Sequence, residues 1–238
     1  PDYNRFLQMA EKIMPSNYKI YTLESDNNDG NMISRIINTN HIEYDAEHLK
    51  KYHGVPYSVG LDIFPLDYIS RNREDDELQN DIIIMISSVM DIIKSIEDNN
   101  IQLDEENLNR INMQISQIES VCGVTIKRDN KIVQQLNILI DRICGIYRED
   151  EADYLTIMLL WVGNKNYKFP KDFYNKTIRI SYENMTIPVP YAYDSILKKK
   201  YGDYMKLVHT WDSHDYPFFE SQKKVIENAG IDVNRYVD

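Results

Sequence analysis

One carboxylate, Asp62, stands in a pattern that can support chemistry. Residues 59–64 alternate as a β-strand does, and one face of this strand carries Gly60, Asp62 and Phe64. A carboxylate between apolar neighbours is costly to bury unless a cation or several donors satisfy it. Gly60 leaves room on the same face for a ligand or a metal to approach. We therefore take Asp62 as a candidate metal ligand, against the alternative of an edge strand with Asp62 in solvent.

Two further polar residues, Asp67 and Arg35, are also candidates for a functional role. Pro65 has no N–H to donate to a strand ladder, so it is expected to close the strand and to begin a turn that carries Asp67. Arg35 lies within a second predicted strand, residues 31–39. An arginine in such a strand either forms an ion pair at the rim of the sheet or uses its planar fork to hold a phosphate or carboxylate.

Other residues have the types that bind metals but lack a convincing arrangement. Three histidines are spaced by seven and five positions, which fits no standard zinc pattern: His41, His48 and His53. A second group near the C-terminal end would suit a metal hydrolase, although its spacing is weak support: His209, Asp212 and His214. We expect the first group on loops and keep the second as an alternative.

Four blocks of the sequence resemble the LicD family of phosphocholine transferases, relatives of fukutin. Residues 59–67 (VGLDIFPLD) are similar to its G-I-D-I-F-P-L-D signature, and residues 2–7 (DYNRFL) to its D-Y-x-R-F-L helix start. Residues 35–39 (RIINT) are similar to R-x-x-N-T, and residues 187–205 carry a related C-terminal signature ending in Y-G-D-Y-M. The blocks occur in the family's order, whereas residues 70–150 match none.

This resemblance implies an activity and a set of site residues. The expected reaction moves phosphocholine or a related alcohol phosphate from a CDP-activated donor, such as CDP-choline, to a hydroxyl of a cell-surface glycan, with Mg²⁺ or Mn²⁺. Asp62 would be the catalytic, metal-binding acid. The residues expected to bind substrate are Arg35, Thr39, Asp67, Tyr201 and Asp203.

The resemblance also implies a fold and a departure from the family pattern. The expected fold is α/β (α+β), a nucleotidyltransferase-like mixed sheet with flanking helices and a helical insertion. The family's D-D-D-I-D motif precedes the helix that begins here at Asp2, so this chain is expected to hold only part of a metal site and to be inactive alone. The alternative is a non-catalytic, glycan- or partner-binding relative.

Composition narrows the class of partner. With 27 basic and 38 acidic residues among 238, the net charge is −11, which argues against a nucleic-acid binder. No apolar run approaches the ~20 residues of a membrane span. Two cysteines, Cys122 and Cys144, favour a reduced, cytoplasmic setting, with a peripheral position at the inner membrane face compatible with it. The oligomeric state stays open.

Periodicity predicts three segments: 1–70 and 151–238 as parts of the core, and 71–150 as a helical insertion. A helix is expected over 2–14 and a strand over 18–23. Apolar stripes predict three helices in the insertion, and the apolar run 155–162 suits a buried strand. In the last segment the expected elements are a hairpin of 177–182 with 185–189 and a helix over 194–201, stopped by Gly202.

Overall fold

A computed structural model describes residues 2–25, 33–38 and 60–206. The protein is mixed α/β, 52% helix and 19% strand. By its internal contacts the chain forms two units: residues 1–21, 35–63 and 203–238, and residues 22–34 with 64–202. The predicted segment boundaries at 70 and 150 do not coincide with this division. Within the described residues, no helix has both the length and the apolar character needed to cross a membrane.

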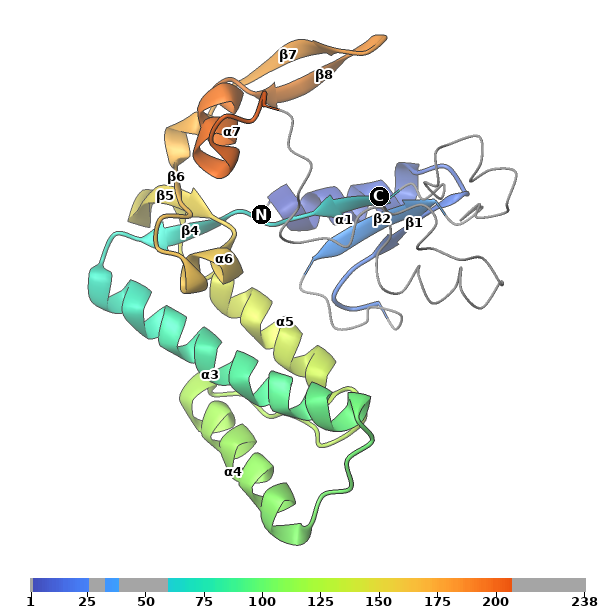
Figure 1. Cartoon of the computed structure of the whole chain (residues 1–238), viewed down its shortest axis with the longest axis vertical. Helices are drawn as coiled ribbons and strands as arrows, with labels where there is room; N and C mark the ends of the chain where they lie inside the picture. Colours follow the sequence, from blue (N-terminus) through green and yellow to red (C-terminus); the bar gives the residue numbers. More distant parts are fainter. Residues whose placement is uncertain (1, 26–32, 39–59, 207–238) are drawn as a thin grey trace. The chain divides into compact units, whose positions relative to one another are not determined.

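The described residues of the first unit form one helix and a three-stranded sheet (Figure 1). Helix α1 (Asp2–Ile13) confirms the predicted N-terminal helix, with Ala10 as its buried residue. The strands follow the order β1 (Tyr18–Tyr21), β2 (Ser34–Asn38) and β3 (Gly60–Ile63), and β1 pairs antiparallel with β2. The strand predicted around Asp62 is therefore present. It lies at the edge of the sheet formed by the described strands, not in its interior.

The second unit has its own small sheet. Strands β4 (Asp67–Ser70), β5 (Ala152–Thr156) and β6 (Phe169–Pro170) pair antiparallel in that order. Asp67, which was predicted to lie in a turn, is instead the first residue of β4. The predicted strand over 155–162 is wrong beyond Thr156, because the chain turns into helix α6 (Met158–Gly163). The sheets in the described residues are small and separate.

Three helices make the largest hydrophobic core, as the apolar stripes predicted. They are α3 (Arg73–Asp98), α4 (Glu105–Cys122) and α5 (Ile132–Cys144). The residue before each of the first two helices caps its N-terminus: Asn72 accepts a hydrogen bond from Glu74 N, and Asp104 accepts one from Asn107 N. The least exposed apolar side chains of the core are Ile83, Ile86, Ile115, Ile118, Leu136 and Ile140.

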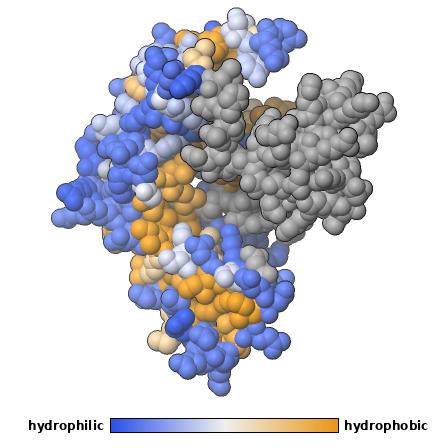
Figure 2. Space-filling view, viewed as in Figure 1, coloured by the Kyte–Doolittle hydropathy of each residue, from blue (hydrophilic) through white to orange (hydrophobic). Residues whose placement is uncertain are grey.

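Hydrophobic side chains also remain on the surface of this helical layer. Figure 2 shows them gathered over the region of α3 and α4 in the lower part of the view. The large apolar residues of the two helices that are exposed are Leu78, Ile84, Leu108, Met113 and Val121. Scattered exposure of this kind is common on folded proteins and by itself assigns no function.

The last described elements are a hairpin and a short helix (Figure 1). Strands β7 (Thr177–Tyr182) and β8 (Met185–Pro190) pair along their whole length, which confirms the predicted hairpin. Helix α7 (Tyr193–Tyr201) follows and ends at Gly202, whose φ of 67° requires glycine and whose N–H bonds to the carbonyl of Lys198. The second unit also contains two 3-10 turns: Glu149–Glu151 precedes β5, and Lys171–Tyr174 follows β6.

Candidate functional site

The two residues singled out on separate strands of the first unit meet in the structure. Strand β3 presents Asp62 beside β2, which carries Arg35, and Arg35 Nε donates to Asp62 Oδ1 at 2.7 Å. The two side chains are 38% and 42% exposed, respectively, so the pair lies at the surface. An exposed ion pair of this kind contributes about 0–1 kcal/mol to stability. Its main effect is to set the direction of both side chains.

The pairing leaves part of each group available. Only Nε of the Arg35 guanidinium bonds within the described residues, so its terminal nitrogens can donate to an incoming oxyanion while Asp62 holds the group in place. Asp62 Oδ2 likewise has no hydrogen-bond partner there. The arrangement matches both readings of Arg35: it is an ion pair at the rim of the sheet, and it presents a directed guanidinium fork.

The fit of a divalent cation to this site is partial. Mg²⁺ and Mn²⁺ prefer carboxylate, phosphate and water oxygens, and Asp62 Oδ2 can supply one of them. Elsewhere in the part of the chain that the structure describes, no group of three or more His, Cys, Asp or Glu side chains is arranged to hold a metal. Any further ligands would have to come from outside this part, from substrate phosphates or from water.

Asp67 occupies a very different environment in the second unit. As the first residue of β4 it pairs with Thr156 of β5, and its Oδ1 would lie 3.9 Å from a Cβ placed on Gly145, just after α5. Burial, and then the negative charge of Asp141, raise the pKa of Asp67 to about 7. None of the described residues donates a hydrogen bond to its carboxyl group. A carboxyl with this pKa can take up or release a proton near neutral pH.

Two ionisable groups near Asp67, those of Asp141 and Cys144, also have raised pKa values. Burial raises the pKa of Asp141 on α5, with Arg142 lowering it and Glu24 raising it further. Gln134 of α5 donates to the carbonyls of Leu23 and Ser25, which fixes the segment bearing Glu24 against the helix. Burial likewise raises the pKa of the Cys144 thiol well above its usual range, with Asp67 and Asp141 adding to the effect. Cys144 and Cys122 are both free thiols.

The remaining expected site residues are not brought to Asp62 by anything described. Tyr201 ends α7, is 60% exposed and lies under the Lys200 ammonium, 5.1 Å from the ring centroid. Asp203 follows on the surface, and its carbonyl accepts the N–H of Lys206. Thr39 lies outside the described residues. So do the histidine groups at 41–53 and 209–214.

A buried polar cluster around Asp76 was not predicted from the sequence. Asp76 on α3 is 8% exposed and accepts from Trp161 Nε1 at 2.8 Å and from Asn80 Nδ2 at 2.9 Å. Lys165 lies 3.7 Å from its second carboxylate oxygen. Asp76 belongs to the acidic first turn of α3, where negative charge complements the helix dipole, and its bond to Trp161 also ties α3 to α6. No local signal links residues 85 positions apart.

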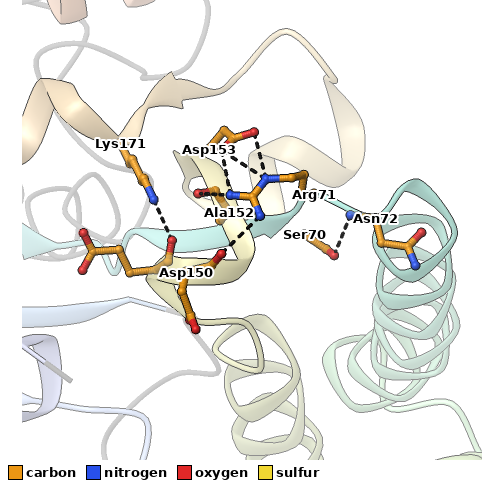
Figure 3. A network of polar contacts seen from close by, with 8 residues as sticks. Ser70, Arg71, Asn72, Asp150, Ala152, Asp153 and Lys171 are labelled. Atoms are coloured by element: carbon orange, nitrogen blue, oxygen red, sulfur yellow. Dashed lines mark hydrogen bonds and ion pairs between the residues drawn. The ribbon is translucent and has the colours of Figure 1, made fainter.

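Arg71 shows what a fully engaged arginine looks like in this protein (Figure 3). Its Nη2 bonds to Asp153 Oδ1 at 2.9 Å, its Nε bonds to both oxygens of that carboxylate at 3.2 Å, and Nη1 bonds to the carbonyl of Asp150. Lys171 donates to the neighbouring carbonyl of Glu149. This network fastens the end of β4 to the start of β5. It leaves Arg71 little capacity for a ligand, in contrast to Arg35.

Comparisons of the chain with protein-family models, with curated proteins and with solved structures found no match. The candidate site therefore rests on the residues themselves. Within the first unit, Arg35 and Asp62 form the one expected pair of site residues that the described structure brings together.

Proposed function

We propose that this protein is a LicD-like transferase with a nucleotidyltransferase-like core. In this proposal it moves phosphocholine or a related alcohol phosphate from a CDP-activated donor to a hydroxyl of a glycan. The observation that carries the proposal is the contact between Arg35 and Asp62, because two blocks that resemble the family from separate parts of the sequence supply its two partners.

The chemistry of the pair suits a phosphate donor. Transfer of a substituted phosphoryl group requires its negative charge to be held and its position to be fixed. Asp62 orients the Arg35 guanidinium through Nε, and the two terminal nitrogens can then donate to phosphate oxygens in parallel. A bound Mg²⁺ or Mn²⁺ would neutralise charge that develops on the phosphates. Asp62 Oδ2 is the atom of this pair that would contact it.

The test compares Asp62→Asn with the parent in the full-length protein. Asparagine keeps the shape of the side chain but loses the charge that orients Arg35 and binds a cation. We expect transfer from CDP-choline to be lost and calorimetric binding of CDP-choline with Mg²⁺ to weaken, while the melting temperature stays within about 2 °C. Asp91→Asn, an exposed aspartate of α3, is the control and should transfer normally.

Two results would separate this proposal from its alternative. Full transfer by Asp62→Asn with unchanged metal-dependent binding would remove Asp62 from the mechanism. If the parent bound no cytidine diphosphate ligand but did bind a glycan, it would be the non-catalytic relative. The structure gives that alternative one argument: Arg35 and Asp62 form an exposed ion pair with each other, as residues of a purely structural rim would.

A further inference from the structure

The hairpin of β7 and β8 is a sheet of only two strands in the described part of the chain (Figure 1). None of the other described helices and strands packs broadly against either of them. A two-stranded hairpin is marginally stable by itself in water, whereas a sheet of three or more strands with a hydrophobic face is stable. A further strand added to one edge of this hairpin would therefore stabilise it.

The hydrogen-bond pattern identifies the backbone groups that point away from the hairpin. At its open end the N–H of Tyr191 bonds to the carbonyl of Lys176, so these two residues are a hydrogen-bonded pair. Hydrogen-bonded and non-hydrogen-bonded pairs alternate along an antiparallel ladder, and the residues of non-hydrogen-bonded pairs direct their N–H and C=O outward. With the register of the hairpin, the outward groups of β7 belong to Thr177, Arg179 and Ser181, and those of β8 to Thr186, Pro188 and Pro190.

The outer edge of β8 is closed to a further strand. Pro188 and Pro190 have no N–H to offer, and proline on an edge strand is one of the features that prevent pairing with another chain. The carbonyl of Thr186 already accepts a hydrogen bond from Arg179 Nη2 at 2.7 Å. Each outward position of β8 is therefore either a proline or already bonded.

The outer edge of β7 lacks this protection. The strand contains no proline, and its outward backbone groups have no hydrogen-bond partner among the described residues. A charged side chain can also guard an edge, and the only charged residue of β7 is Arg179. Its Nε bonds to Thr186 Oγ1 at 3.0 Å, so the guanidinium lies over β8 and leaves the edge of β7 uncovered. The two edges of the hairpin thus differ, and only that of β7 can accept a strand.

The side chains of the hairpin divide into an apolar and a polar face. Alternate positions place six apolar residues on one face: Ile178, Ile180, Tyr182, Met185, Ile187 and Val189. Tyr182 and Met185 are 54% and 58% exposed. Residues 177–190 carry one base and one acid, whereas the chain has a net charge of −11, so repulsion between two copies is small at this hairpin. A strand that pairs with β7 must continue the apolar face and keep a base away from Arg179.

We propose that the outer edge of β7 pairs antiparallel with β7 of a second copy of this chain, which forms a four-stranded sheet about a twofold axis. The strand β7 meets both requirements when Ile180 lies opposite Ile180 of the second copy. Ile178 then faces Tyr182, which continues the apolar face, and Arg179 faces Ser181. The interface goes beyond the proposed transferase function and does not depend on it.

The neighbouring registers of this pairing are less favourable. A register centred on Arg179 would place two arginines directly opposite each other, which destabilises a strand pair. A register centred on Ile178 would place Ile180 opposite Lys176 and leave Tyr182 without an apolar partner. The side chains of β7 therefore select one twofold register, the one centred on Ile180.

The first test measures the mass of the full chain by analytical ultracentrifugation over a range of concentrations. The parent should approach twice the mass of one chain. Ser181→Pro removes an outward N–H of β7 without breaking a bond to β8, and it should raise the dimer dissociation constant at least about tenfold, since the twofold axis makes each loss count twice. The matched control is Thr186→Pro, which changes the residue opposite Ser181 on the closed edge and should stay within about twofold of the parent.

The second test examines the register by disulfide cross-linking with diamide. The Cα atoms of a non-hydrogen-bonded pair lie about 4.5 Å apart, within the range of a disulfide, so Ile180→Cys should give a covalent dimer. Ile178→Cys lies on the same face, but its two copies would be about 14 Å apart, and it should not cross-link. Both variants carry Cys122→Ser, whereas the other native thiol, Cys144, is buried.

Three outcomes would overturn the proposal. A parent that stays monomeric at all concentrations would exclude a second copy as the occupant of this edge. Equal losses in Ser181→Pro and Thr186→Pro would mean that the dimer requires only an intact hairpin. Cross-linking of Ile178→Cys as fast as that of Ile180→Cys would exclude the twofold pairing of β7. Circular dichroism shows whether the proline variants are folded, and the cross-linking result decides if Ser181→Pro is not.

Discussion

Replacing Asp67 by asparagine tests the most perturbed carboxyl that lies near the neutral range. Its pKa rises from an ordinary 3.8 to about 7, because of burial first and the charge of Asp141 second. A carboxyl whose pKa is higher in the folded state binds its proton more tightly there than in the unfolded chain. Its contribution to stability is present below pH 4 and is lost as the pH rises towards 7.

The size of the effect follows from the shift. About three pKa units correspond to about 4 kcal/mol, at 1.36 kcal/mol for each unit. Water rearranging around the ionised carboxylate reduces that cost, so we expect about 1–4 kcal/mol. Asparagine cannot ionise. The free energy of unfolding of Asp67→Asn should therefore rise relative to the parent between pH 4 and pH 7, and the difference should level off above pH 7.

The assay is urea unfolding of both proteins at pH values from 4 to 8. Taking the difference at each pH removes the titration of the other groups, and the effect of exchanging a hydroxyl for an amide remains as an offset that does not change with pH. Asp91→Asn, exposed on α3, should give a difference that does not change with pH. Asp141→Asn removes the second cause, so the loss of stability that Asp67 produces should be smaller and should end at a lower pH. Parallel curves for Asp67→Asn and the parent would refute the reasoning.

Three more predictions follow from other contacts. Arg35→Lys keeps the charge but loses the fork, so CDP-choline affinity should fall while the melting temperature stays within about 2 °C; early melting with normal transfer would make Arg35 structural. Trp161→Phe leaves Asp76 short of a buried donor and should cost about 1–3 kcal/mol in urea unfolding, and an unchanged midpoint would contradict this. Leu136→Ala, at a position with 0% exposure, should cost about 2–5 kcal/mol, and a cost below 1 kcal/mol would show that the helices α3 and α5 close around the cavity.

Elements with a strong local pattern were predictable from the sequence. The three long helices follow from apolar stripes of period 3.6, which can be buried only on one side of a helix. The hairpin follows from β-prone residues on both sides of Glu183 and Asn184, and the end of α7 follows from Gly202. In each case neighbours in the sequence decide the conformation.

The apolar run after residue 154 shows where local reasoning stops. Its length favoured a buried strand although its periodicity could not exclude a helix, and the structure divides it between a strand and a helix at Ile157. The hydrogen bond from Trp161 to Asp76 ties the helical part to α3. That partner lies 85 positions earlier, so no window of the sequence contains the information.

Arg35 and Asp62 can be recognised in the sequence as candidates for chemistry, because a charged residue within an apolar strand needs a partner. That each is the other's partner, across 27 positions, follows only from the folded structure. The same holds for Asp67, whose pKa is raised by burial and by Asp141, and for Lys199 of α7, which lies over the ring of Phe169. Burial and charge act through space, and a folded chain brings together residues that its sequence separates.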